Sequence, residues 1–233
     1  MPPASHWRGH LFLFDPRAAA TYPADAGWKL LLIVVLLEAV IGPRFHLFGW
    51  LGLPMPHPAA RVALSLVLAL VLVRYFAGAA FAAIGLRRWR EWSATEKSYF
   101  VQVVVIANVV FAALYAGRLP ATSAVPGFWL ALATSFAWGF YQEVVYRGLL
   151  QTELSRRLGP IAGILLSNLA YTFGPLHFYH FAQPSPWPML AAIFAIGLFF
   201  AVLLHRSRNL WMVAVFHGIG TAWILGINGV RLH

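Results

Sequence analysis

Long hydrophobic runs separated by short polar segments dominate this chain of 233 residues. A helix needs about 20 apolar residues to cross the roughly 30 Å hydrocarbon core of a membrane. The runs that approach or exceed this length are Trp28–Ile41, Ala60–Leu86, Ser98–Gly117, Gly127–Leu150, Pro160–Phe181, Trp187–His205 and Asn209–Ile227. The pattern predicts an all-α fold, a polytopic membrane helical bundle with about seven transmembrane helices.

Nothing in the pattern separates folded domains, because no long linker and no internal repeat interrupts the hydrophobic runs. We therefore expect one membrane domain. Along the sequence it is divided into a cytoplasmic N-terminal segment 1–27, N-terminal transmembrane helices 28–126, C-terminal helices 127–227 and a tail 228–233. Residues 1–27 lack the basic start and apolar run of a cleavable signal peptide.

Composition supports a membrane protein, since 61% of the residues are hydrophobic and only 10% are charged. The net charge of +10 comes largely from segments around Arg88, Arg157 and Arg208, which fall on one side of a seven-helix topology. Basic loops are typical of the cytoplasmic side. We expect a multi-pass protein of the plasma (inner) membrane, with a cytoplasmic N-terminus, an outside C-terminus and no nucleic-acid partner. Zero cysteines exclude thiol chemistry and disulfides.

Polar residues inside the expected spans are few, and a charge at the bilayer centre costs at least about 2.5 to 3.5 kcal/mol. They are Glu38, Arg74, Glu143, Arg147, His177, His180 and His217. Glu38 and Arg74 come to similar depths on neighbouring antiparallel helices when about 1.5 Å is counted per residue. We expect them to form a structural ion pair, because a buried charge without a partner is the costlier state.

The fourth expected helix carries an acid and a base one turn apart, in YQEVVYRGLLQTELSRRLGP. Glu143 lies on nearly the same face as Arg147, which predicts an ion pair, whereas Gln142 lies about 140° from Arg147 on an α-helix. We expect the helix to extend to Leu158 and to end at the following Gly-Pro pair.

The fifth expected helix is interrupted by proline two residues before His177. A proline at 175 removes a donor and frees the carbonyl of Tyr171, which predicts a kink and a polar cavity beside His177. Depth counting brings Glu143, His177 and His217 within reach of one another. His180 need not face the same cavity, because three helical residues turn a side chain by about 60° from the starting direction.

Together these motifs resemble those of the CPBP (Abi-like) family, the CAAX-protease and bacteriocin-processing intramembrane proteases. The matching elements are Glu143-x-x-x-Arg147, then Phe173-x-x-x-His177, then NLWMVAVFHG with His217, in this order. The resemblance covers roughly residues 127–227 and implies that these are CPBP-like catalytic helices. It implies peptide hydrolysis within the membrane by glutamate- and histidine-activated water.

Roles follow from this resemblance and from the needs of acyl transfer, a base near water and donors near the developing oxyanion. Glu143 is the expected base, His177 its partner in holding water, and His217 an oxyanion donor. Arg147 is expected to fix Glu143. Two positions depart from the family pattern: Gln142 replaces a glutamate that would activate water, and Thr221 replaces an asparagine but retains a hydroxyl donor.

No cofactor is expected, and the alternative is a divalent metal such as zinc held by Glu143, His177 and His217. The expected activity is that of an intramembrane endopeptidase of the glutamic rather than metallo type. Its partners would be membrane lipid and a lipidated or membrane-anchored protein, cut near the C-terminus. The alternatives are a non-catalytic binding or immunity protein, suggested by Gln142, and a small proton-coupled transporter that uses Glu38, Glu143 and the histidines.

Overall fold

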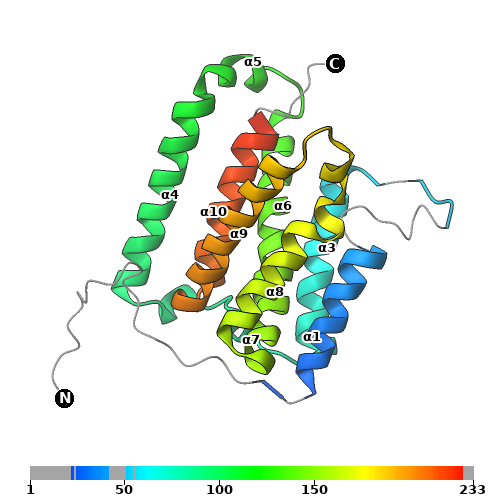
Figure 1. Cartoon of the computed structure of the whole chain (residues 1–233). Coiled ribbons are helices and arrows are strands. Elements are labelled where there is room, and N and C mark those ends of the chain that lie inside the picture. The colour runs from blue at the N-terminus through cyan, green and yellow to red at the C-terminus, as the bar shows by residue number, and fades with distance from the viewer. Residues whose placement is uncertain (1–21, 24, 42–50, 55, 228–233) are drawn as a thin grey trace.

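The computed structural model describes residues 22–23, 25–41, 51–54 and 56–227, and they contain helices and no strand (Figure 1). The all-α prediction is confirmed for this part of the chain. Residues 1–21 of the expected cytoplasmic segment 1–27 and the expected outer tail 228–233 lie outside the described residues. The helices are α1 Ala26–Val35, η1 Leu36–Ile41, α3 Pro58–Val71, η2 Leu72–Phe76, η3 Phe81–Ile84, η4 Trp89–Glu91, α4 Ala94–Tyr115, η5 Ala116–Arg118, α5 Leu119–Ser123, α6 Phe128–Glu143, η6 Val144–Gln151, α7 Thr152–Leu158, α8 Pro160–Phe173, η7 Pro175–Ala182, α9 Trp187–Ser207, α10 Leu210–Thr221 and η8 Ala222–Ile227.

Four of these helical stretches are long and apolar enough to cross a membrane: Pro58–Phe76, Ala94–Arg118, Trp187–Ser207 and Leu210–Ile227. They indicate an integral membrane protein. The expected number of seven spans is not confirmed. One reason lies in α8, which the sequence pattern extended to Phe181 but which ends at Phe173, leaving an apolar helix of only 14 residues.

The boundary between α7 and α8 agrees with the sequence prediction. The rod formed by α6, η6 and α7 ends at Leu158, and Gly159 follows with a φ of 84° in the region that favours glycine. Pro160 then takes the first position of α8, where its missing N–H has no helical partner to lose. The resulting tight turn sets α8 beside the end of the long rod.

Close packing of α6 against α10 fixes the depth of the two helices relative to each other. A Cβ atom added at Gly139 would lie 2.6 Å from Thr221 Oγ1 and 2.9 Å from the carbonyl oxygen of His217. A Cβ added at Gly218 would lie 2.8 Å from the Phe136 ring. Small residues at a contact between membrane helices allow such close approach, and this contact brings the end of α6 beside the middle of α10.

Helix η6 is a π-helix, in which each N–H bonds five residues back rather than four. It begins directly after Glu143 and includes Arg147. The wider turn changes which side chains share a face, so a spacing of about 100° per residue no longer holds across the motif. Short π segments inside helices are frequent at functional sites.

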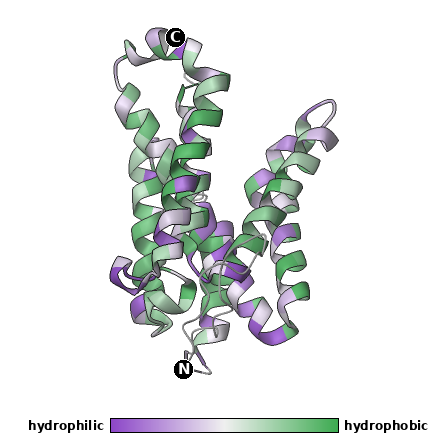
Figure 2. Ribbon diagram, turned by 90° about the vertical axis from the view of Figure 1, so that its left-hand side faces the viewer, coloured by the Kyte–Doolittle hydropathy of each residue, from purple (hydrophilic) through white to green (hydrophobic). Residues whose placement is uncertain are grey.

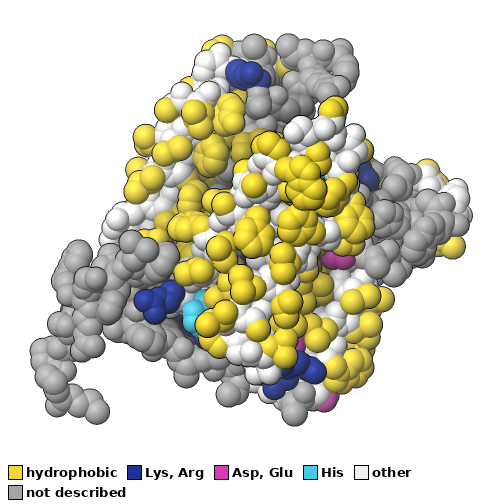
Figure 3. Space-filling view, viewed as in Figure 1, with side chains coloured by type: hydrophobic (Ala, Val, Ile, Leu, Met, Phe, Trp, Pro, Cys, Tyr) yellow, Lys and Arg dark blue, Asp and Glu magenta, His cyan; other side chains and the backbone are white. Residues whose placement is uncertain are grey.

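Hydrophobic residues cover most of the helices, and hydrophilic ones gather toward one end of the bundle and among the helices (Figure 2). A broad hydrophobic surface faces the viewer over α8 and α9 (Figure 3). The exposed hydrophobic residues of these two helices include Ile161, Leu166, Trp187 and Ile196. Such a surface is compatible with contact to lipid tails.

A cavity of about 460 Å³ lies between α4, α6, α10 and η8. Its lining is almost entirely apolar and includes Phe136, Ile219 and Trp223. The side-chain amide of Asn108 also lines the cavity. Its Oδ1 accepts a hydrogen bond from Trp223 Nε1 at 3.0 Å, and its Nδ2 donates to the carbonyl oxygen of Val104 at 2.8 Å. The residues expected at the catalytic site do not line this cavity.

Candidate active site

Glu143 and His217, 74 residues apart in sequence, are in direct contact. Glu143 Oε1 lies 2.7 Å from His217 Nδ1, and the carboxylate is fully buried at the end of α6. An ionised carboxylate only accepts hydrogen bonds, so Nδ1 of His217 carries the proton in this contact. The close packing of α6 and α10 therefore produces an acid–imidazole pair in which the carboxylate is fully buried and the imidazole is partly exposed.

Arg147 lies on the other side of Glu143 and is held by three elements. Its Nε is 3.5 Å from Glu143 Oε2, an ion pair in which both side chains are fully buried, as the sequence predicts. Its Nη2 donates to Asn168 Oδ1 of α8 at 3.2 Å and to the carbonyl oxygen of Gly197 of α9 at 3.0 Å. Glu143 Oε2 accepts no hydrogen bond from the described residues. Oε2 of Glu143 is thus attracted to the charge of Arg147, but it accepts no hydrogen bond from a described residue.

The absence of a side chain at Gly197 makes room for this arginine. A Cβ there would overlap Asn168 Oδ1 and would lie 2.8 Å from Arg147 Nη2 and 3.1 Å from the Tyr171 ring. The carbonyl that binds Arg147 belongs to the same glycine. The approach of α9 to Arg147 therefore depends on glycine at this position.

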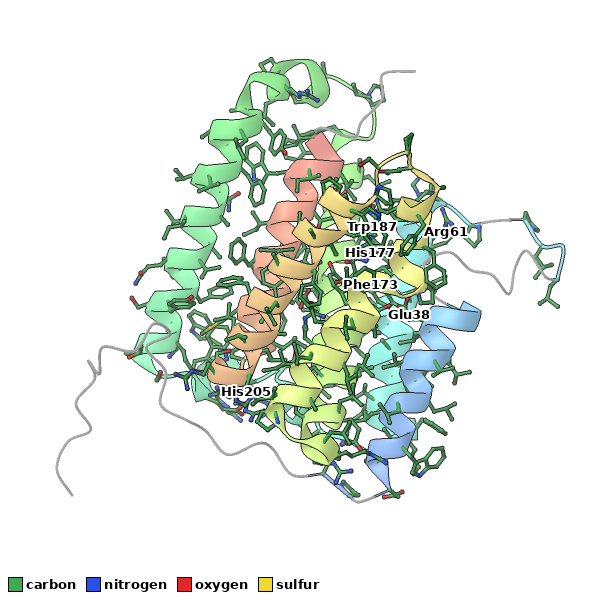
Figure 4. All side chains as sticks on the ribbon, viewed as in Figure 1. Glu38, Arg61, Phe173, His177, Trp187 and His205 are labelled. Atoms are coloured by element: carbon green, nitrogen blue, oxygen red, sulfur yellow. The ribbon has the colours of Figure 1, made fainter. Side chains whose placement is uncertain are left out.

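His177 is oriented by the break that Pro175 makes in the helix. α8 ends at Phe173, Gly174 is extended, and the short 3₁₀ helix η7 begins at Pro175. His177 Nδ1 lies 2.7 Å from the carbonyl oxygen of Tyr171, which confirms that the proline frees this carbonyl. Because a carbonyl only accepts, Nδ1 is the donor and Nε2 is the acceptor of the neutral ring. Figure 4 shows His177 beside the end of α8, far from His205.

The 3₁₀ geometry corrects the sequence prediction for His180. Three residues complete one turn of a 3₁₀ helix, so side chains at i and i+3 eclipse instead of standing about 60° apart. The rings of His177 and His180 are stacked with centroids 5.7 Å apart, and each residue is only 7% exposed. Both histidines therefore face the same side of η7.

Tyr171 joins the parts of the site, and the sequence analysis used only its carbonyl. Its hydroxyl donates to Gln142 Oε1 at 3.2 Å, and its ring lies 4.5 Å below the guanidinium carbon of Arg147. The same ring meets the imidazoles of His177 and His217 edge to face, with centroids 4.8 and 6.2 Å away. This buried tyrosine therefore contacts all four of these polar side chains, which are Gln142, Arg147, His177 and His217.

The shared contact corrects the expected separation of Gln142 and Arg147. On an α-helix these residues stand about 140° apart, yet both touch Tyr171. The π-turn that begins at Val144 accounts for the difference, because it brings residues five apart toward one side. Gln142 is thus part of the same polar cluster, with its carbonyl oxygen used as an acceptor.

Thr221 makes a different contact from the expected one. Its hydroxyl donates to the carbonyl oxygen of His217 at 2.8 Å, one turn earlier on α10. The same hydroxyl packs against Gly139 of α6. Its single donor is therefore used within the helix, where it supports the His217 backbone.

The expected ion pair between Glu38 and Arg74 is wrong. Among the ion pairs of the described residues there is none between them, and Arg74 is exposed. Glu38 instead accepts hydrogen bonds from the Tyr146 hydroxyl at 3.0 Å and from the Tyr141 hydroxyl at 3.4 Å. Counting residues along two helices gives the depth of each charge, but it does not give the direction in which the Arg74 side chain points.

Within the described ranges, no group of three or more His, Asp or Glu side chains is arranged to hold a metal ion. Glu143 directs one oxygen at His217 Nδ1 and the other at Arg147. A zinc site on Glu143, His177 and His217 would need this carboxylate to leave one of those partners. The residues present do not fit that alternative without rearrangement.

Residues 123–223 match the family model described as type II CAAX prenyl endopeptidase Rce1-like. The matched region contains Glu143, Arg147, Tyr171, His177 and His217, and it agrees with the resemblance found from the motifs. Neither the curated proteins nor the solved structures give a significant match.

Proposed function

We propose, from the match of residues 123–223 to the family model described as type II CAAX prenyl endopeptidase Rce1-like, that this chain is an intramembrane endopeptidase. Its substrate would be a lipidated or membrane-anchored protein, cleaved near the C-terminus by glutamate- and histidine-activated water. The observation that carries the proposal is the contact at 2.7 Å between Oε1 of the fully buried Glu143 and Nδ1 of His217, whose side chain is 16% exposed.

In the proposed mechanism Glu143 is the general base. Its Oε2 is the oxygen without a hydrogen-bond donor among the described residues, so it is suited to accept a proton from water. The water oxygen then bonds to the scissile carbonyl carbon, and the carbonyl π electrons move to oxygen. When the tetrahedral intermediate collapses, the C–N bond breaks and the proton passes from Glu143 to the departing amine.

The two histidines would have different tasks because their Nδ1 atoms have different partners. His177 Nδ1 donates to the Tyr171 carbonyl, so Nε2 accepts a hydrogen bond from the attacking water and orients it. His217 donates from Nδ1 to Glu143, and in its protonated form Nε2 also donates, toward the oxyanion. Arg147 would hold Glu143 in place, and Tyr171 would hold the imidazole rings of both histidines.

The lipid-facing surroundings of this cluster bear on the substrate. Exposed hydrophobic residues lie on η7 and directly before it, among them Phe178, Phe181 and Phe173. A peptide with a hydrocarbon anchor would be concentrated at such a surface, since apolar groups leave water for the bilayer. We propose the plasma (inner) membrane as the location, with the N-terminus cytoplasmic and the C-terminus outside.

The test is cleavage of membrane-anchored peptides by the purified protein in lipid vesicles, followed by metal analysis of the same sample. Cleavage by metal-free protein supports glutamate-based hydrolysis, whereas activity that follows bound zinc supports the metal alternative. A folded wild type that cleaves no anchored peptide would contradict the proposal.

A second candidate function is membrane-peptide binding without cleavage, and Gln142 favours it. Its amide oxygen accepts the Tyr171 hydroxyl, which is a structural contact, and an amide is no base. This candidate predicts that wild-type protein binds an anchored peptide without cutting it and that Gln142→Glu gains cleavage. The proposed function predicts cleavage by the wild type.

A further inference from the structure

A partly buried carboxylate, Glu38 of η1, lies at the edge of the site and has no task in the proposed mechanism. Figure 4 shows Glu38 below His177, and η1 packs against η7. We infer that Glu38 is a positioning residue of the site, which holds the Tyr146 ring against Tyr171 and so fixes both imidazoles. The inference deepens the proposed function and rests on it for its kinetic consequence.

Two tyrosine hydroxyls from the long rod converge on this carboxylate. Tyr146 donates to Oε2 of Glu38 at 3.0 Å, and Tyr141 donates to Oε1 at 3.4 Å. The two tyrosines are five residues apart, and on an α-helix they would stand about 140° apart. The π-turn of η6 brings them to one acceptor.

The two rings lead to different places. Tyr146 is 2% exposed and meets the Tyr171 ring edge to face, with centroids 5.3 Å apart. Tyr171 in turn touches His177, His217 and Arg147. Tyr141 stacks on Trp138 at 5.7 Å. Of these two hydrogen bonds to Glu38, the one from Tyr146 therefore leads through Tyr171 to the catalytic histidines.

A buried phenol without an acceptor is unfavourable, so removal of the Glu38 charge weakens the restraint on the Tyr146 ring. If that ring turns to find another acceptor, Tyr171 loses the neighbour that supports one of its edges. The imidazoles that pack on the other edges of Tyr171 then gain freedom to reorient. Glu38 acts through two aromatic rings and does not need to touch the substrate.

The test compares Glu38→Gln, Tyr146→Phe and Tyr141→Phe. Tyr141→Phe is the matched control, because it removes a hydroxyl from the same carboxylate but on the ring that stacks on Trp138. We expect Glu38→Gln and Tyr146→Phe each to lower kcat about tenfold or more, the scale of one hydrogen bond to a charged group. KM changes little, and the double variant is no slower than either single one, because both interrupt one chain of contacts.

A second measurement does not depend on activity. With ¹⁵N-labelled histidine, we expect the imidazole signals of His177 and His217 to shift in Glu38→Gln and Tyr146→Phe and to stay in place in Tyr141→Phe. Unchanged signals in both site variants would overturn the inference. Equal shifts in Tyr141→Phe would also overturn it, since Glu38 would then only anchor η1 to the rod.

The two readouts separate this inference from the proposed function. If the wild type cleaves nothing but the imidazole signals respond as expected, the endopeptidase proposal fails and the positioning role of Glu38 stands. If the wild type cleaves and neither kcat nor the signals respond to Glu38→Gln or Tyr146→Phe, the positioning role fails alone.

Discussion

At the residue scale, Glu143 is the side chain on which the proposed chemistry depends. Replacement by glutamine retains an oxygen that accepts the His217 Nδ1–H but removes the charge beside Arg147 and the base. Losing one member of a buried ion pair costs about 3 to 5 kcal/mol, and the polar amide limits that loss. We expect Glu143→Gln to eliminate hydrolysis in a folded protein, as measured with an anchored peptide in vesicles.

Gln142→Ala is the matched control on the neighbouring residue. It removes the acceptor of the Tyr171 hydroxyl and leaves the Glu143–His217 contact in place, so measurable activity should remain. Cleavage that persists in Glu143→Gln, or that disappears only in Gln142→Ala, would assign the base to another residue.

Two of the contacts could be predicted from the sequence, because charges and proline have strong physical consequences in a membrane. Glu143 was expected to meet Arg147, and the carbonyl of Tyr171 was expected to be freed near His177; both are observed. The Tyr171 ring was missed because an aromatic residue within a span is usually packing. One signal was available, since Ser167, Asn168 and Tyr171 place polar groups on successive turns before the proline.

At the element scale, the 3₁₀ helix η7 determines how the two neighbouring histidines share the site. His177 is the one bonded to the Tyr171 carbonyl, and His180 stacks on its ring. We therefore expect His177→Ala to abolish cleavage and His180→Ala to reduce it without abolishing it, because His180 supports His177 from one side. Kinetics of both variants test this. Equal and complete loss in His180→Ala would assign it a direct catalytic task.

The turn that begins α7 carries a charge cluster that links stability to pH. Glu153 is fully buried, and Tyr22, Arg156 and Arg157 all donate to its carboxylate. Burial alone raises the pKa of Glu153, but the hydrogen bonds from Arg156, Tyr22 and Arg157 outweigh it and lower the pKa to about 2 from 4.5. A lowered folded-state pKa stabilises the fold above pH 4.5 and ceases to do so as pH falls toward 2.

We expect Glu153→Gln to lower the unfolding free energy near neutral pH by about 1 to 3 kcal/mol, discounted for the solvent exposure of the arginines. The variant should also lose most of the wild-type decline in stability between pH 4.5 and 2. Thermal unfolding in detergent at several pH values measures both effects. Glu91→Gln makes the same change at an exposed carboxylate and should behave as wild type. Parallel pH profiles for wild type and Glu153→Gln would contradict the assignment.

The spacing of residues in the sequence does not show whether a helix is α, 3₁₀ or π. The estimate of about 140° between Gln142 and Arg147 and of about 60° between His177 and His180 assumed α-helical geometry throughout. The chain departs from that geometry in η6 and η7, and at both places the departure brings polar residues together. The proline marks η7 in the sequence, whereas the residues of η6 carry no comparable signal.

At the scale of the whole molecule, the basic segments gather at one end of the bundle. The regions of η3 and η4, the end of α7 and the turn from α9 to α10 all lie at the lower end in Figure 1. We expect this end to face the cytoplasm, because basic residues are retained there during insertion. Single cysteines at positions 88, 157 and 208, probed in intact cells with an impermeant thiol reagent, should remain unlabelled until the cells are opened.

The absence of native cysteines makes each introduced thiol the only one in the chain. A cysteine at Gly127, on the opposite end of the rod from Leu158, is the positive control and should be labelled from outside. Labelling of position 157 from outside would contradict the predicted orientation.

The all-helical fold and its long apolar helices could be predicted from hydropathy, because burial in lipid requires long apolar runs. The number that span the membrane could not. The helix ending at Phe173 is shortened by Gly174 and Pro175, and the rod of α6, η6 and α7 carries the buried charges of the site. Hydropathy measures only apolar length, so it cannot distinguish a complete crossing from a helix that stops at a polar cluster.

The glycines at the helix contacts affect how a set of substitutions that abolish cleavage should be interpreted. Gly139, Gly197 and Gly218 have no reactive group, yet an added methyl would meet Thr221, Arg147 and Phe136 respectively. If a library of variants is scored only by loss of cleavage, these three glycines would be grouped with Glu143 and His177. The apparent active site would then include more residues than those that take part in the reaction. Over evolutionary time these positions would tolerate as little drift as the catalytic residues. Only a parallel count of folded protein separates residues that react from residues that make room.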